Sequence, residues 1–311
     1  MALIKIVMKI LCYINGIMPI LEGNDKTTHF NKVSKEISLR LGDPWIKIQM
    51  QLDYDYIHDP QSSWRSLLSP FYDMPGAMKG YLVKYPKLNY FYWTLKISDQ
   101  INFKPSTLDK YLCIEKLPDT KPRKISLFGP YSLYKSINYE GRGCEAKLDI
   151  VNYLLMNTLD YLYSQGYELF DFYEPWIIDV NLDLLSDLYR MIGRKYNYVI
   201  HTGLIDITKI IAFLVKLKLG IPLIDIFEND LSKIKVQGNV ISLGVIDTRE
   251  CFIERYYIVR EATKKLVNIS MIDTIMITNN THLVFLPSHI ALDKIKLLVE
   301  IKRRLSIEWN N

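Results

Sequence analysis

The side chains best suited to chemistry in this 311-residue sequence stand at the ends of short apolar runs. From about residue 124 onward, each such run is followed directly by polar, ionisable or helix-breaking residues. If the runs are parallel strands, these residues meet at one edge of a sheet, where ligand sites are assembled. The alternative is that they cap helices and seal that edge. The residues are Gly129, Pro130, Tyr173, Glu174, Pro175, His201, Phe227, Glu228, Asp247, Thr248, Arg249, Asn279, Asn280, Thr281 and His282.

Two groups suggest a chemistry from their residue types alone. Asp247 and Arg249 could orient a ligand that carries a carboxylate, because a guanidinium donates a bidentate pair of hydrogen bonds. The alternative is an Asp–Arg ion pair that only ties the loop after the strand. The aromatic run from Tyr90 to Trp93 could stack on a heteroaromatic ligand, although strand alternation predicts that half of it faces the core. The sequence contains no GxGxxG, GxSxG or HExxH motif.

The elements that position these residues alternate regularly after residue 124. Apolar runs predict strands over 124–128, 168–172, 198–201, 221–226, 240–245 and 274–278. Helical spacing of apolar residues predicts helices over 146–163, 182–192, 207–218, 253–267 and 287–305, with only a short helix after residue 226. Alternating strands and helices with short connections indicate a parallel sheet with right-handed crossovers.

The first 120 residues are less regular. Their pattern predicts helices over 31–41 and 45–52, and strands over 9–14, 54–57 and 88–97. These three strands and five of the later ones make the eight that a closed (β/α)8 barrel of the TIM type requires. We therefore expect an α/β fold of this kind with extra N-terminal elements. No linker or repeat divides the chain, so residues 1–311 are predicted to form one domain, with residues 1–45 as the N-terminal extension, first strand and first helix.

Composition and charge exclude several classes of protein. The net charge of +5 comes from 39 Lys and Arg against 34 Asp and Glu, without a dense basic stripe, so we expect no nucleic-acid partner. Lys5 and Lys9 interrupt the apolar N-terminus and Pro19 breaks the remainder of the run, so a buried strand over 9–14 is favoured over a membrane anchor. The four cysteines are widely separated and predict neither a disulfide framework nor a Cys-rich zinc site. We expect a cytoplasmic protein.

Four strand-end motifs follow one another along the chain. Gly129-Pro130-Tyr131-Ser132-Leu133 is similar to a GP(V/Y)(T/S)-L strand end, and Tyr173-Glu174-Pro175 to a D-E-P motif. The segment from Ser242 to Arg249 is close to S-L-G-V-V-D-G-R, and that from Thr278 to Pro287 to a strand that carries N-P-D-C-G-L-x-x-L-P. In this order, from about residue 45 to the end, the chain resembles the cobalamin-independent methionine synthase family, a barrel family that methylates homocysteine through a zinc-bound thiolate.

The family has an N-terminal barrel without metal and a C-terminal catalytic barrel, and this chain is more similar to the N-terminal kind. Asp59-Pro60-Gln61, followed by Trp64-Arg65, resembles the D-G-Q-L-x-W segment of that barrel. Asn89-Tyr90-Phe91-Tyr92 likewise resembles its N-Y-H-Y stretch. The resemblance makes Gln61, Tyr90 and Glu174 candidate ligand-binding residues beside Asp247 and Arg249.

The sequence departs from the family pattern at residues that carry out the family's chemistry. Catalysis in the family needs a zinc held by one His, one Glu and two Cys, because the metal lowers the pKa of the homocysteine thiol. His201 aligns with the His and Glu228 with the Glu, but Gly203 and Thr281 stand at the two Cys positions. Tyr173 replaces the Asp of D-E-P, which removes a carboxylate that would bind the substrate's ammonium group.

The resemblance leaves two main hypotheses open. In the first, the chain is a non-catalytic N-terminal-type subunit that assists methyl-donor binding by a separate catalytic barrel and needs no cofactor of its own. In the second, His201, Glu228 and His282 form a reshaped catalytic zinc site, and the chain itself methylates a thiol such as homocysteine. The methyl donor could be a folate, a pterin or a corrinoid, and the sequence does not distinguish them.

Overall fold

The computed structural model describes residues 8–21 and 33–310, with gaps at 89, 99, 141–143, 194, 203–209, 212, 215–218, 235–239 and 270–271. Some predictions fall outside the described residues: Gly203, most of the helix over 207–218, and the beginning of the apolar N-terminus.

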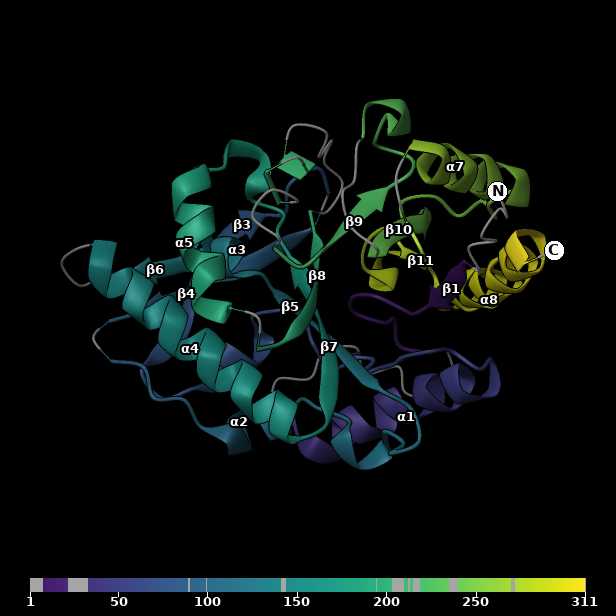
Figure 1. Cartoon of the computed structure of the whole chain (residues 1–311). Coiled ribbons are helices and arrows are strands. Elements are labelled where there is room, and N and C mark those ends of the chain that lie inside the picture. Colours follow the sequence, from purple (N-terminus) through teal and green to yellow (C-terminus); the bar gives the residue numbers. More distant parts are fainter. Residues whose placement is uncertain are drawn as a thin grey trace.

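Eight parallel strands form the main sheet, which curls into a half-barrel (Figure 1). The order across the sheet is β1-β11-β10-β9-β8-β7-β5-β2. This confirms the α/β class and the eight parallel strands. The strands are β1 (Lys9–Cys12), β2 (Ile57–His58), β5 (Arg123–Phe128), β7 (Tyr167–Tyr173), β8 (Asn197–His201), β9 (Ile221–Asp225), β10 (Val240–Ile246) and β11 (Thr274–Asn279).

The predicted closure of the barrel is wrong, because no strand pairing among the described residues joins β1 to β2. The physical reason is the length of β2, whose two residues pair with β5 and are too few for a second ladder. Isolated hydrogen bonds bridge the seam instead. Asp55 donates its backbone N–H to the carbonyl of Cys12 at 3.2 Å. The ring Nε2 of His58 lies 2.6 Å from the carbonyl oxygen of Gly16.

Helices cover the outside of the half-barrel, and β1 lies beside the last helix (Figure 1). Local signals set their ends. The side chain of Asn181 accepts a hydrogen bond from the backbone N–H of Leu184 at 3.0 Å and caps one helix, which ends at Gly193 with a φ of +63°. The helices are α1 (Lys35–Gln51), α2 (Pro105–Asp109), α3 (Pro130–Ser136), α4 (Cys144–Ser164), α5 (Leu182–Ile192), α7 (Tyr256–Ile269) and α8 (Ser288–Asn310).

The prediction of two separate helices over 31–41 and 45–52 is wrong, because α1 continues through Pro44. A proline inside a helix costs about 3 kcal/mol, since it removes one hydrogen bond and crowds the preceding turn. The buried face of α1 offsets this cost. Leu41, Trp45 and Ile46 are all buried, and the indole N–H of Trp45 donates to the carbonyl of Pro19 at 2.6 Å.

The strand predicted over 88–97 does not belong to the main sheet. It forms β4 (Phe91–Ile97), which pairs with β3 (Ala77–Lys84) and β6 (Ile137–Tyr139) in a separate three-stranded sheet. All six later strands, rather than five, therefore complete the main sheet. The turn between β3 and β4 lies over the carboxyl edge of the half-barrel, where Tyr85 contacts His282 (ring centroids 6.0 Å apart) and Tyr90 contacts Phe285 (5.2 Å).

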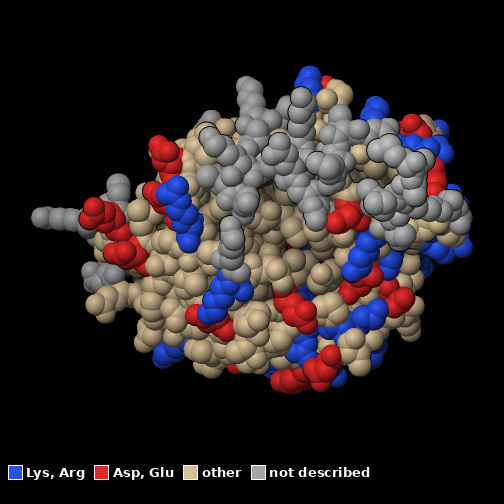
Figure 2. Space-filling model, in the orientation of Figure 1, with Lys and Arg blue, Asp and Glu red and all other residues tan. Residues whose placement is uncertain are grey.

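The surface carries mixed charge, and on the face shown in Figure 2 basic and acidic side chains are interspersed. Many of them form exposed ion pairs, such as Arg190 with Asp187 on α5. No helix in the described part of the chain has the length and apolar character that would be needed to cross a membrane.

Candidate functional site

An ion pair lies inside the half-barrel, below its carboxyl edge. Lys124 on β5 and Asp171 on β7 are fully buried, with the ammonium nitrogen 3.3 Å from Oδ2 of Asp171. The hydroxyl of Ser126 donates to the same oxygen at 3.1 Å, and the ammonium group also lies over the ring of Tyr13, 4.6 Å from its centroid. Burial lowers the pKa of Lys124 to about 8, although the carboxylate of Asp171 opposes this shift.

Two residues further along β7, the ring of Tyr173 fills the centre of the edge. It stacks between the imidazoles of His201 and His282, with ring centroids 4.0 and 4.3 Å away. Its hydroxyl donates to Oδ1 of Asn15 at 2.8 Å, and the backbone N–H of Ile17 donates to Nδ1 of His282 at 3.1 Å. Burial lowers the pKa of His201 to about 4 and that of His282 to about 3, so both rings are neutral at pH 7.

This arrangement does not assemble the predicted zinc site of His201, Glu228 and His282. The two imidazoles stack on the Tyr173 ring, and Glu228 accepts hydrogen bonds from Arg249 and Lys87 instead. Within the described ranges, no group of three or more His, Cys, Asp and Glu side chains could hold a metal ion. The donor atoms present therefore do not fit a resident zinc.

Asp247 and Arg249 do lie together, as an ion pair after β10. Oδ1 of Asp247 accepts hydrogen bonds from Nε of Arg249 at 2.8 Å and from its backbone N–H at 3.0 Å, while Oδ2 accepts from Nη2 at 2.8 Å. Burial opposes the charge of Asp247, but these hydrogen bonds outweigh it and lower its pKa. The remaining Nη1 of Arg249 donates to Glu228, which also accepts from Lys87 at 3.2 Å. The geometry is that of the loop-tying pair, and a ligand role for these two residues stays a prediction.

A third carboxylate, Asp225 at the end of β9, completes this charged cluster. Its Oδ1 accepts from the backbone N–H of Phe227 at 2.9 Å, and its Oδ2 from the amide of Asn280 at 3.2 Å. The same amide donates to Asp247 at 3.0 Å, so Asn280 links β9 to β10. Burial raises the pKa of Asp225 to about 7, and the carboxylate of Asp247 adds to this while Arg249 opposes it.

Glu174 lies fully buried at the N-terminus of α3. Its carboxylate accepts hydrogen bonds from the backbone N–H groups of Tyr131 (3.0 Å) and Ser132 (2.7 Å) and from the hydroxyl of Tyr189 (3.0 Å). This explains the Gly-Pro motif, because a Cβ at Gly129 would lie only 2.3 Å from the carboxylate. Burial raises the pKa of Glu174 to about 7, against these hydrogen bonds. The contacts are those of a helix cap, and ligand binding by Glu174 stays a prediction.

The side chain of Gln61 also forms structural hydrogen bonds. Its side-chain amide donates to the carbonyl of Ser126 at 2.8 Å and accepts from the N–H of Ser126 at 3.3 Å, which ties the segment after β2 to β5. Gln61 has a φ of +52°, which is unfavourable for a residue other than glycine. These hydrogen bonds hold it in that conformation.

Tyr90, by contrast, lines a cavity of about 640 Å³ on one side of the β3–β4 hairpin. Burial raises the pKa of its hydroxyl to about 12. Trp64 and Arg65 line the same cavity from the segment after Gln61, so the two segments that resemble the N-terminal barrel meet here. Other aromatic residues of the lining are Tyr72, Phe91, Tyr92, Trp93 and Tyr111.

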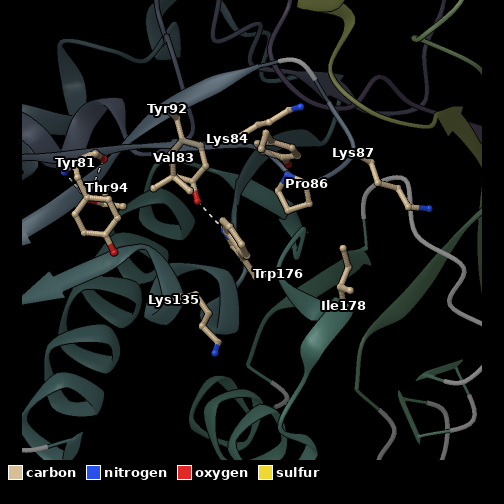
Figure 3. A pocket seen from close by; sticks show the side chains of 11 residues that line it. Tyr81, Val83, Lys84, Pro86, Lys87, Tyr92, Thr94, Lys135, Trp176 and Ile178 are labelled. Carbon is tan, nitrogen blue, oxygen red and sulfur yellow. Dashed lines mark hydrogen bonds between the residues drawn. The ribbon is translucent and has the colours of Figure 1, made fainter.

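A second cavity, of about 540 Å³, lies on the other side of the hairpin and was not predicted. Its lining includes Lys84, Lys87, Lys135 and Trp176 (Figure 3). The available signals were Trp176 directly after the Tyr-Glu-Pro motif and the lysines around Tyr85. Their meaning was hidden because residues 88–97 were interpreted as a strand of the main sheet rather than as half of a hairpin.

The sequence matches no protein-family model and no curated protein. Among solved structures, the fold is similar to a B12-independent methionine synthase from Shewanella sp. W3-18-1 in complex with selenomethionine (16% identity, TM-score 0.74, 97% of this chain and 98% of that chain covered). It is also similar to a putative vitamin-B12 independent methionine synthase from Listeria monocytogenes (12% identity, TM-score 0.70, 96% and 99% covered). A methyltransferase from Methanosarcina mazei is a further neighbour (11% identity, TM-score 0.60, 96% and 94% covered).

These comparisons define the class of the fold, which is that of the methionine synthase-like and methyltransferase barrels. At such low identity the likeness is one of fold alone, and function rests on the site.

Proposed function

We propose that this chain is a methionine synthase-like barrel without a zinc methyl-transfer centre of its own, which assists methyl-donor binding by a separate catalytic barrel. The observation that carries the proposal is the position of Tyr173. Its ring occupies the space between His201 and His282, the residues that would have to converge on a metal. A zinc-activated thiolate needs a position open to substrate, and a fully buried stack of three rings offers none there.

The cavity beside Tyr90 supports the part of the proposal that concerns the methyl donor. At about 640 Å³ it has the size of a small-molecule site, and its lining includes seven aromatic residues together with Arg65, Lys79 and Asp73. Aromatic walls stack on planar ring systems such as a pterin. The segments that resemble the N-terminal barrel supply these walls.

Exposed apolar side chains on the hairpin support a partner protein. Leu82 on β3 pairs with Trp93 on β4, and Phe91 lies two residues away on the same face. Leu82, Phe91 and Trp93 are between 43% and 51% exposed. Neighbouring apolar side chains left exposed on one face are typical of interaction surfaces.

The test is methyl transfer to homocysteine by the purified protein, alone and mixed with a separately produced catalytic barrel, with a methylated folate, a methylated pterin and a methyl-corrinoid as donors. We expect no transfer by the protein alone, and a faster reaction of the catalytic barrel when the protein is added. The variant Trp93→Asp should lose this stimulation, while Phe252→Asp, at an exposed site in the loop after β10, should retain it.

Zinc content, measured by elemental analysis, distinguishes the proposed barrel without zinc from the alternative of a reshaped zinc enzyme. About one zinc per chain that is lost in His201→Ala and His282→Ala, but kept in the exposed control His289→Ala, would overturn the proposal. Methyl transfer by the protein alone would overturn it equally.

A further inference from the structure

The second cavity, of about 540 Å³, lies between the β3–β4 hairpin and the loop after β7 (Figure 3). Val83 and Tyr92, which are cross-strand partners, form its hairpin side, and Trp176 and Ile178 form the side contributed by the loop. The cavity is distinct from the one beside Tyr90, although the two share Tyr92. Its volume is within the range of sites for small molecules rather than for a protein segment.

The charge around this cavity has one sign. Three lysines and no Asp or Glu are found among the described residues that line it. Lys84 and Lys87 lie on the hairpin side, and Lys135 lies beyond the Trp176 ring (Figure 3). Neither Lys84 nor Lys135 forms an ion pair with a carboxylate in the described part of the chain, whereas Lys87 contacts Glu228 at 3.2 Å. A cavity whose only charged lining residues are lysines favours an anionic ligand over a cationic one.

The walls are aromatic and held in place by hydrogen bonds. The indole N–H of Trp176 donates to the hydroxyl of Tyr92 at 2.6 Å, and that hydroxyl lies 2.9 Å from the hydroxyl of Ser136 on α3. These contacts hold one edge of the Trp176 ring and leave the ring as a preformed wall for a planar ligand.

Tyr85 lines this cavity and also borders the carboxyl edge of the half-barrel, where its ring contacts Phe128 and His282. Its buried hydroxyl has no hydrogen-bond partner within the described residues.

We propose that this cavity is a binding site for a small planar aromatic anion, with its ring against Trp176 and its phosphate or carboxylate arm toward Lys84 or Lys135. The proposal is independent of the proposed function, since it requires neither methyl transfer nor a catalytic partner. Phosphate and carboxylate arms share the required chemistry, and two matched probes distinguish them.

Binding is measured by tryptophan fluorescence and calorimetry at low and high salt. The phosphate probe is adenosine 5′-monophosphate with adenosine as its uncharged control, and the carboxylate probe is N-benzoylglutamate with its diamide as control. We expect at least one anion to bind about tenfold or more tightly than its control, since charge-assisted hydrogen bonds are worth about 1.5–3 kcal/mol each. Salt should reduce the difference. The chain has five tryptophans, so loss of the signal in Trp176→Phe assigns it.

The double variant Lys84→Gln/Lys135→Gln should weaken binding of that anion about tenfold or more and leave its control unaffected. Both lysines are exposed, so the fold should be retained. Lys79→Gln is the matched control, because Lys79 lies on the same strand but lines the other cavity. The proposal is overturned if neither anion binds, if anions bind no better than their controls, or if the double variant binds as the wild type does.

Discussion

The interior of the half-barrel and the two sides of the β3–β4 hairpin use similar residues in opposite ways. Inside, Lys124 is paired with Asp171, and Tyr173 is stacked between two imidazoles, with no space between them. Beside the hairpin, Lys84 and Trp176 face a cavity of about 540 Å³. The comparison teaches that the buried cation of the interior is paired with a carboxylate of the protein, whereas Lys84 beside the hairpin lines a cavity and forms no ion pair with a carboxylate of the described residues.

The contrast also explains why the strand-end residues are poor guides to function in this chain. Glu174 caps α3, Arg249 ties Asp247 to Glu228, and His282 packs on Tyr173. These three side chains therefore each have a structural partner. The two cavities are lined by residues of the β3–β4 hairpin instead, an element outside the main sheet.

The largest expected effect concerns the buried ion pair. Lys124→Met should cost about 3–5 kcal/mol, because it leaves the carboxylate of Asp171 buried without its cation. The double variant Lys124→Met/Asp171→Leu should recover most of this loss, since both charges are removed. Urea denaturation measures both.

The exposed pair of Arg190 and Asp187 supplies the control, and Arg190→Met should change stability by less than about 0.5 kcal/mol. If Lys124→Met proved as mild as this surface variant, the interior would not be a satisfied low-dielectric site, and the comparison would fail.

The pH dependence of stability also tests how strongly burial affects Lys124. Burial lowers the pKa of Lys124 to about 8, below its ordinary value of 10.5, so between these values the unfolded chain holds a proton that the folded chain releases. The free energy of unfolding should therefore rise with pH in this window, and the full penalty is present below pH 8. Between pH 8 and 10 the wild type should gain about 2 kcal/mol relative to Lys124→Met/Asp171→Leu. A constant difference between the two proteins would show that Lys124 titrates normally.

The sequence predicted the second half of the fold well because strong local signals determine it. The α5 bounds agree with the apolar spacing, its Asn cap and its terminal glycine. The first 120 residues were predicted less well. The closed barrel fails at a two-residue strand, α1 passes through a proline, and 88–97 pairs with β3 rather than with the main sheet. Such pairing choices depend on long-range contacts, which local periodicity does not report.

For the candidate site, the sequence indicated which residues lie at the strand ends but not which side chains they contact in the folded chain. The alternative of an ion pair between Asp247 and Arg249 agrees with the structure, while ligand binding by these residues and by Tyr90 stays a prediction. The sequence did not indicate that the Tyr173 ring would lie between His201 and His282, because the three residues are far apart in sequence and only the curvature of the sheet brings them together. The hypothesis of a zinc site at His201, Glu228 and His282 therefore has no support from the described side chains, among which no metal-binding group is found.

A smaller effect tests the hydrogen bond of the buried Tyr173 hydroxyl. Tyr173→Phe retains the stack but removes the donor to Oδ1 of Asn15, which should cost about 1–2 kcal/mol. The aromatic circular dichroism should stay close to that of the wild type. Tyr163→Phe, at an exposed position on α4, should change stability by less than about 0.5 kcal/mol. Equal effects of the two variants would mean that the Tyr173 hydroxyl is not specifically bound.

The smallest expected effect on stability comes from the charged cluster at the rim, where the two regions meet. Arg249→Ala should cost only about 1 kcal/mol, because the side chain is 25% exposed and water can replace part of its hydrogen bonding. Asp247 should stay in place, since its carbonyl accepts a hydrogen bond from the buried Lys294 at 2.7 Å. Arg249→Lys should retain the charge but lose the bidentate geometry. If Arg249→Ala kept the fold and abolished binding of a carboxylate ligand, the charged cluster at the rim would be a ligand-binding surface. It would then be grouped with the hairpin and not with the interior of the half-barrel.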